Sequence, residues 1–141
     1  MIKNVHIYSI SGFKVDKIKI HNLLSFLIKQ LKISINSLEI NFINSKEIKR
    51  LNKKHLSHDY STDILTFGYS DIKREIDGEI FISIDDVKEN SKIFNVSLQN
   101  ELFRLVIHGV LHLIGFDDIK EADRKEMKSI ENLLLNNFCK L

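Results

Sequence analysis

The chain has 141 residues, of which 43% are hydrophobic and 28% are charged. This balance is typical of a folded globular protein and excludes an intrinsically disordered chain. The length favours a single domain that spans residues 1–141, since no linker or low-complexity tract interrupts the sequence. The net charge of +2 is too small to indicate a nucleic-acid partner by itself.

Cysteine content and hydropathy bear on the cellular location. Cys139 is the single cysteine, which excludes an intrachain disulfide framework and fits a reducing cytoplasm. The segment 1–13 alternates apolar and polar residues and lacks the apolar run of a signal peptide. No run approaches the ~18 apolar residues that a membrane-spanning helix needs. We therefore expect a cytoplasmic protein without a membrane partner.

The N-terminal half shows strand and helix patterns in alternation. The expected elements are a strand at 5–8, a helix at 20–31, a strand at 38–42 and a helix to about residue 55. Asn44, followed three residues later by Glu47, is typical of a capped start for that last helix. Its apolar residues Ile48 and Leu51 are expected to point inward.

The C-terminal half is expected to hold a polar loop, two strands and three helices. These are a loop at 57–63, strands at 64–67 and 79–84, and helices ending near 94, at 98–114 and at 121–138. Asp77-Gly78 predicts a turn before the second strand, and Asp85 and Asp86 predict the cap of the next helix. Ser97 is the expected cap of the long helix, and Gly115 its expected stop.

The last helix should pack through one apolar face. That face comprises Ile130, Leu133, Leu134 and Phe138. The elements together predict an α+β fold, with a small mixed sheet packed by helices and a buried metal-binding helix.

Basic residues crowd the short helix that follows Asn44. They are Lys46, Lys49, Arg50, Lys53 and Lys54, with Glu47 as the acidic residue among them. Two interpretations stay open: an ordinary solvated helix face, or an electrostatic track for an RNA backbone.

The long helix carries the residues with metal-binding chemistry. From Val106 to Ile114 it is apolar except for His108, Gly109 and His112. Histidines four residues apart lie on one helix face, where both imidazoles can reach one ion. Gly115 lets the chain turn back, so that Asp118 can supply a third ligand. The alternative is a pair of core histidines with ordinary hydrogen bonds; the glycine and the following carboxylates favour one Zn²⁺ ion.

Three protein ligands and an open position are typical of a catalytic zinc site, which lowers the pKa of bound water to about 7. Zinc peptidases of the H-E-x-x-H type place a glutamate after the first histidine as general base. Here Gly109 occupies that place, so peptide hydrolysis by that route lacks its base and is a minor alternative. Two histidines and a carboxylate also suit iron, although the helical spacing favours zinc.

These residues carry a resemblance to a known family. His108 to Asp118 reads H-G-V-L-H-L-I-G-F-D-D and resembles the H-G-x-L-H-L-x-G-[YF]-D-H signature of the YbeY-type endoribonuclease family. Residues 51–67 resemble the family's L-N-x-x-Y-R-x-x-D-x-P-T-D-V-L-S-F stretch, and residues 78–83 its G-D-I-x-I-S strand. The three matches lie in order, so the resemblance covers nearly the whole chain.

The resemblance implies a zinc-dependent endoribonuclease specific for single-stranded RNA. It implies a role in 16S rRNA 3′-end maturation and late ribosome quality control, with ribosomal RNA and small-subunit proteins as partners. His108 and His112 match two of the family's metal ligands. Asp118 stands where the family has a histidine, and a carboxylate oxygen is an adequate zinc ligand. Asp117 matches the family's own aspartate and is expected beside the ligands; it could also exchange roles with Asp118.

Two departures concern the expected substrate groove. Leu56 replaces the family's arginine and removes a forked phosphate-binding group, and Ser61 replaces its proline. Candidates for the missing phosphate contact are Lys53, Lys54, His55 and His58, although the two histidines are expected in the first place as ordinary surface residues. Asp59, Thr62 and Asp63 are expected either as turn and cap residues or as part of the groove.

Two functional hypotheses therefore remain from different classes. The first is a metal-dependent endoribonuclease in which the basic helix and loop engage the RNA backbone. The second is a non-catalytic ribosome-assembly factor with a structural metal, which the replacement of arginine by Leu56 favours.

Overall fold

The computed structural model of the chain describes residues 2–56 and 62–141. Within them, the elements are β1 (Val5–Ser9), α1 (Lys17–Leu31), β2 (Ser34–Ile43), α2 (Ser45–Leu56), β3 (Ile64–Gly68), β4 (Glu75–Ser83), α3 (Ile84–Ile93), α4 (Leu98–Leu113) and α5 (Glu121–Cys139). No helix in this described part is long and apolar enough to cross a membrane.

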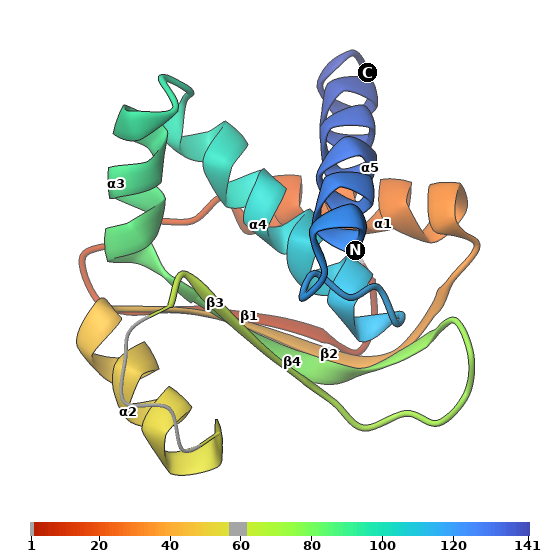
Figure 1. Cartoon of the computed structure of the whole chain (residues 1–141), viewed down its shortest axis with the longest axis horizontal. Coiled ribbons are helices and arrows are strands. Elements are labelled where there is room, and N and C mark those ends of the chain that lie inside the picture. Colours follow the sequence, from red (N-terminus) through yellow and green to blue (C-terminus); the bar gives the residue numbers. More distant parts are fainter. Residues whose placement is uncertain (1, 57–61) are drawn as a thin grey trace.

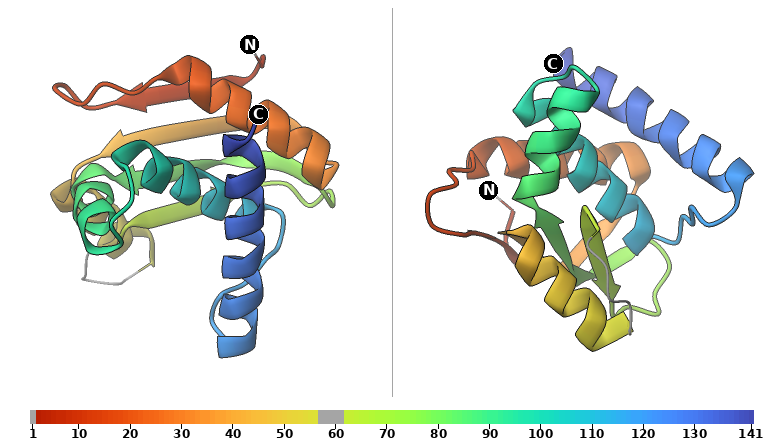
Figure 2. Two further views of the ribbon diagram at one scale, coloured as in Figure 1. Left: turned by 90° about the horizontal axis from the view of Figure 1, so that it is seen from above. Right: turned by 60° about the vertical axis from the view of Figure 1, so that its left-hand side comes forward.

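The sheet is mixed and has the strand order β1-β2-β4-β3. Strands β1, β2 and β4 run parallel, and β3 pairs antiparallel with β4. Ile7, Ile40 and Ile80 lie side by side in register and are buried on one face of the sheet. Helices α1, α3, α4 and α5 lie on that side of the sheet, whereas α2 lies on the other (Figure 1; Figure 2, left). The predicted α+β class with a small mixed sheet is confirmed.

Helix α4 packs closely on the sheet, and Gly109 is the reason that it can. A Cβ atom at this position would lie 2.8 Å from Ile80 Cδ1 and 3.2 Å from Ile64 Cδ1. Any side chain here would overlap the isoleucines of β3 and β4. Gly109 therefore serves close packing, and nine residues of α4 are buried, as expected for this helix.

The turn predicted at Asp77-Gly78 is wrong. Both residues lie inside β4, and the chain turns between Ile72 and Glu75, where Arg74 has a left-handed φ of 63°. Gly78 serves close packing: a Cβ atom there would lie 2.5 Å from the Phe67 carbonyl oxygen and 3.0 Å from Leu113 Cδ2. A glycine in a strand marks either a turn or a close approach, and here it lets the end of α4 meet the β3–β4 pair.

Of the predicted N-caps of α3 and α4, the first is wrong and the second is confirmed. Ser83, and not Asp85 or Asp86, is the N-cap of α3. Asp85 instead accepts a 2.7 Å hydrogen bond from the Ser45 backbone N–H at the start of α2. Ser97 caps α4 as predicted, by accepting a 3.0 Å hydrogen bond from the Asn100 N–H.

The inner face predicted for α5 is wrong in one position. Leu133 is 61% exposed, whereas Leu134 is buried and Ile130 and Phe138 are partly buried. Glu131 occupies the inward position near Leu134 and is only 2% exposed. A buried glutamate on the packed face of a helix requires a polar partner, and α4 supplies it.

Candidate metal centre

The polar atoms of His108, His112 and Asp118 converge on one point. The two Nε2 atoms are 3.0 Å apart, and Asp118 Oδ2 lies 3.4 Å from His108 Nε2 and 3.3 Å from His112 Nε2. Donor atoms of a tetrahedral zinc site, with bonds of about 2.0–2.2 Å, lie about 3.3 Å from one another. Within the described residues, these three form a group that could hold a metal ion.

Both imidazoles are oriented through their other ring nitrogen. His108 Nδ1 lies 2.5 Å from Glu131 Oε2, and His112 Nδ1 lies 3.0 Å from the Phe116 carbonyl oxygen. Because these oxygens accept hydrogen bonds, they fix the N–H on Nδ1 and leave the Nε2 lone pairs directed at Asp118. Two imidazole lone pairs that face a carboxylate are the donor set of a cation site.

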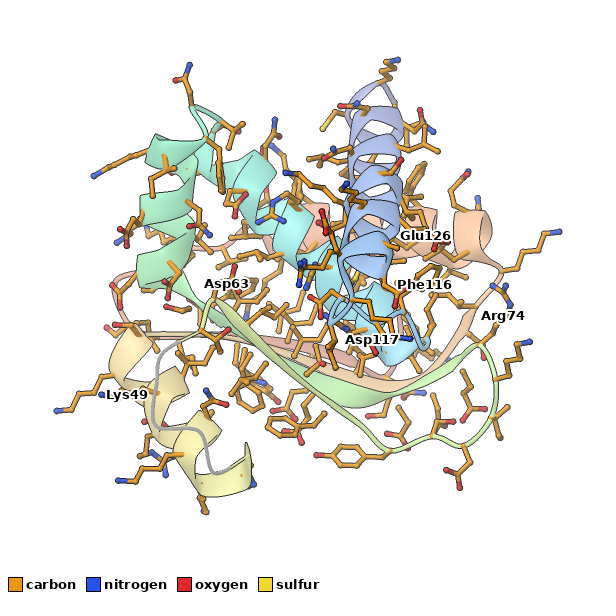
Figure 3. The ribbon with its side chains drawn as sticks, in the orientation of Figure 1. Lys49, Asp63, Arg74, Phe116, Asp117 and Glu126 are labelled. Atoms are coloured by element: carbon orange, nitrogen blue, oxygen red, sulfur yellow. The ribbon has the colours of Figure 1, made fainter. Side chains whose placement is uncertain are left out.

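Backbone hydrogen bonds hold the loop that brings Asp118 back toward His108 and His112. Gly115, with a φ of +107°, ends α4, and the Phe116 N–H donates to the Leu111 carbonyl at 3.0 Å. Asp117 accepts a hydrogen bond from the Ile119 N–H at 3.0 Å and thereby stabilises its own turn. Asp118, and not Asp117, joins the two histidines, although Asp117 stays in the adjacent turn. Figure 3 shows Asp117 and Phe116 beyond the end of α4.

A buried charge network behind His108 was not anticipated from the sequence. Arg104 donates to Glu101 Oε1 and Oε2 at 2.8 and 2.7 Å, and to Glu131 Oε1 at 3.1 Å. The hydrogen bond to Glu101 is the main reason that the pKa of Arg104 is raised. Glu101, Arg104, His108 and His112 recur at three- or four-residue intervals on one face of α4. That spacing was available as a signal; the partner on α5 was not.

The charge balance of His108 follows from this network. Burial has the largest single influence on the pKa of His108 and lowers it, whereas the hydrogen bond and charge of Glu131 raise it. The carboxylates of Asp118 and Asp63 add to the rise, so the net pKa is above its ordinary value. Glu131 therefore favours positive charge at this position, whether it is carried by a proton or by a cation.

Two cavities meet at His108 and Asp118. The smaller, of about 290 Å³, is lined by His108, His112 and Asp118 together with residues 62–66. The larger, of about 570 Å³, lies between α4 and α5 and also reaches His108 and Asp118. The group of three therefore has open space on two sides.

Thr62 and Asp63 line the smaller cavity. This position is relevant to whether they act as turn and cap residues or as part of the substrate groove. Burial raises the pKa of the Asp63 carboxyl above its ordinary value, against the opposing charges of His108 and Arg104. Figure 3 shows Asp63 just before β3. Its position places a carboxyl group beside the three converging residues without making it one of them.

The proposed substrate-binding residues that the structure describes do not line the two cavities at this centre. Lys53, Lys54 and His55 are exposed on α2 and line neither cavity. The His55 ring packs edge-on against Phe67 at 5.4 Å between centroids. His58 and Asp59 lie outside the described residues. Binding of RNA by these five residues stays a prediction.

Comparison with known proteins places the chain in a family. A model of the family described as "Endoribonuclease YbeY" matches residues 6–139, and a match over that length decides the assignment. The chain belongs to the YbeY endoribonuclease family. The family resemblance expected from the sequence motifs is thereby confirmed.

Individual YbeY relatives agree with this assignment. The chain is similar to proteins named endoribonuclease YbeY from Chlorobium limicola, with 43% identity over 74% of this chain and 72% of the relative, and Chlorobium phaeobacteroides, with 36% identity over 98% and 96%. It is also similar to the solution structure of TM1509 from Thermotoga maritima, with a TM-score of 0.64 and 28% identity over 95% of this chain and 88% of that one. These three similarities cover between 74% and 98% of the chain.

Proposed function

We propose that this chain is a metal-dependent endoribonuclease that hydrolyses single-stranded RNA. The observation that carries the proposal is the convergence of His108, His112 and Asp118 beside open space in a YbeY-family chain. The proposal extends to a single domain over residues 1–141, which acts in the cytoplasm on the 3′ end of 16S rRNA and in late ribosome quality control. Ribosomal RNA and small-subunit proteins are its proposed partners.

The proposed ion is one Zn²⁺, held by the three converging residues. A zinc ion supplies Lewis acidity toward phosphodiester oxygens and makes water a nucleophile near neutral pH. Glu131 and the Phe116 carbonyl hold the Nδ1 protons of the two histidines, so that both Nε2 atoms stay available as ligands. Asp63, in the same cavity, is placed to accept or return a proton near the reacting phosphate.

The packing of Gly109 speaks against the peptidase alternative. A peptidase of the H-E-x-x-H type needs a glutamate there, but even a Cβ atom would lie 2.8 Å from Ile80 Cδ1. An Ile80 side chain that is fully buried leaves no room for a carboxylate to reach the ion. The sheet below α4 therefore disfavours that catalytic arrangement.

A second candidate function is a ribosome-assembly factor with a structural metal, which is favoured by Leu56 in place of the family's arginine. The deciding experiment measures cleavage of a single-stranded RNA that carries the 16S 3′ end, with zinc-loaded protein, after chelation and after zinc is restored. The enzyme hypothesis expects cleavage that is lost and regained with the metal. Binding of RNA without cleavage, unchanged by chelation in a folded protein, would establish the assembly factor instead. Elemental analysis of the purified protein identifies the ion.

A further inference from the structure

The cavity of about 570 Å³ between α4 and α5 is larger than a metal ion and a water molecule need. Its size lies within the range of about 300–1,000 Å³ that is usual for pockets that take small organic ligands. His108 and Asp118 belong to its wall and also to the wall of the smaller cavity. An RNA strand with a phosphodiester at His108, His112 and Asp118 would therefore continue into this cavity.

The wall of this cavity combines apolar surface with amide groups. Phe94, at the end of α3, is 58% exposed and lies at its edge, and the buried side chain of Met127 forms part of its apolar lining. Asn100 and Asn132 contribute side-chain amides, which both donate and accept hydrogen bonds. A flat heteroaromatic ring with a polar edge matches this combination, because an aromatic side chain stacks on its face and amides pair with its edge.

The charges around the cavity favour an anionic chain. The acidic residues Glu101 and Glu131 are already engaged by Arg104 and, for Glu131, by His108. Arg124 and Lys128 are exposed and form no ion pair with any residue in the described ranges 2–56 and 62–141. Arg124 Nη1 also donates a hydrogen bond to the Ile119 carbonyl oxygen at 2.9 Å. Because that partner is neutral, the positive charges of Arg124 and Lys128 remain available for a phosphate.

We propose that this cavity is a nucleoside-binding subsite, which holds one unpaired and unstacked base next to the phosphodiester at His108, His112 and Asp118. Lys128 and Arg124 contact the phosphate that follows this nucleoside. The proposal rests on the proposed endoribonuclease function and adds a physical source for single-strand preference. A base inside a duplex is stacked and paired and cannot enter a pocket between two helices, so it must first be unpaired.

The first test uses the unmodified, zinc-loaded protein and changes only the RNA. A set of single-stranded oligonucleotides of one sequence carries a single abasic site at each position around the cleaved bond. The abasic site at the position of the enclosed nucleoside should raise KM about tenfold, since stacking of one base on an aromatic side chain usually accounts for a factor of that order. Equal KM values for abasic sites at all flanking positions would overturn the subsite.

The second test fills the cavity with a side chain. Asn132→Trp places an indole in the cavity wall, and Asn137→Trp is the matched control on the same helix, exposed but outside the cavity. KM should rise about tenfold for Asn132→Trp and stay near the unmodified value for Asn137→Trp. In the Asn132→Trp protein, the abasic site that raises KM for the unmodified protein should cause no further rise in KM. Equal behaviour of the two variants, with zinc content and thermal unfolding unchanged, would overturn the proposal.

The phosphate contact has its own matched pair. Lys128→Gln should weaken RNA binding and reduce its salt dependence by about 0.7 in the slope of log K against log salt, the value for one phosphate contact on a single strand. Lys125→Gln removes an exposed lysine that does not line the cavity and should leave the slope unchanged. Equal slopes for both variants would remove Lys128 from the subsite.

These results separate the subsite from the proposed function. Cleavage by the unmodified protein, without any effect of abasic sites or of Asn132→Trp, would refute the subsite and leave the endoribonuclease intact. Binding of RNA without cleavage, weakened by the same abasic site and by Asn132→Trp, would refute the enzyme and support a base-binding cavity. Absence of both binding and cleavage would refute both.

Discussion

The charged side chains of α4 and the lysines of α2 lie in opposite environments. On α4, Glu101 is 1% exposed, and each of Glu101, Arg104 and His108 contacts a charged partner at hydrogen-bonding distance. On α2, the four lysines are exposed and form no ion pair with a residue that the structure describes. Figure 3 shows Lys49 directed away from α2 into solvent.

This difference separates two kinds of functional surface. A chemical centre needs groups held in a fixed geometry, which buried hydrogen bonds and packing provide on α4. A surface that follows an RNA backbone needs only positive charge near the phosphates, which exposed lysines provide without fixed partners. We therefore expect single changes on α4 to have large effects and single changes on α2 to have small ones.

The largest effect is expected for His112→Ala, which removes one of the two imidazoles from the converging group. Zinc content should fall well below one ion per chain, and RNA cleavage should fall about a thousandfold or more, because a metal provides several kcal/mol of transition-state stabilisation. His6→Ala, at an exposed position on β1, is the control and should retain both the zinc content and the RNA cleavage of the unmodified protein. Stoichiometric zinc retained by a His108→Ala/His112→Ala double variant would exclude this site.

A smaller effect is expected for Glu131→Gln, which keeps the shape of the side chain but removes its charge. The neutral amide could not balance Arg104 or accept the Nδ1–H hydrogen bond of His108 with a full negative charge, so zinc affinity should fall about 10- to 100-fold, as is usual for a carboxylate that orients a metal-binding histidine. Competition with a chromophoric chelator measures this affinity. Glu126→Gln, at an exposed position of α5, is the matched control (Figure 3). Equal zinc affinities of the two variants would mean that Glu131 serves only the packing of α5.

A moderate effect on stability is expected for Gly109→Ala. Alanine favours a helix by about 1 kcal/mol over glycine, but the added Cβ would lie 2.8 Å from Ile80 Cδ1. Overpacking typically costs about 1–3 kcal/mol, so the free energy of unfolding should fall by about 1 kcal/mol net. Ile80→Val removes the overlapping Cδ1 atom, and in that background Gly109→Ala should cost less or become stabilising. Chemical denaturation of the four proteins gives the coupling; additive effects would contradict the contact.

The comparison of the two helices also explains what could be predicted from the sequence. The spacing of His108 and His112 and the returning Asp118 are local features, because one helix and one short loop determine their geometry. Their convergence was therefore predictable, although metal binding by them remains a prediction. Glu131 was not found, because its partner on α4 lies 23 residues away and is defined only by the packing of two helices.

The wrong predictions about the fold also arise because contacts between distant segments cannot be read from local sequence. Gly78 has the local sequence of a turn residue, but the carbonyl of Phe67 and the side chain of Leu113 determine its role. Asp85 has the local sequence of a cap for α3, but it accepts the backbone N–H of Ser45, 40 residues away. Local patterns gave the type of each element correctly, whereas contacts between distant segments decided which residue serves which purpose.

The smallest effect is expected on α2, for the double variant Lys53→Gln/Lys54→Gln. If these lysines contact RNA phosphates, the slope of log K against log salt should fall by about 0.7 for each lost contact, and affinity at physiological salt should fall only a few-fold. The loss should be similar for all RNA sequences, because phosphate contacts position a strand without reading it. Lys17→Gln/Lys19→Gln on α1 removes the same charge from another exposed helix and serves as control. Equal salt slopes for the two double variants would show that α2 carries an ordinary solvated face, and the RNA would then follow the cavities beside α4 alone.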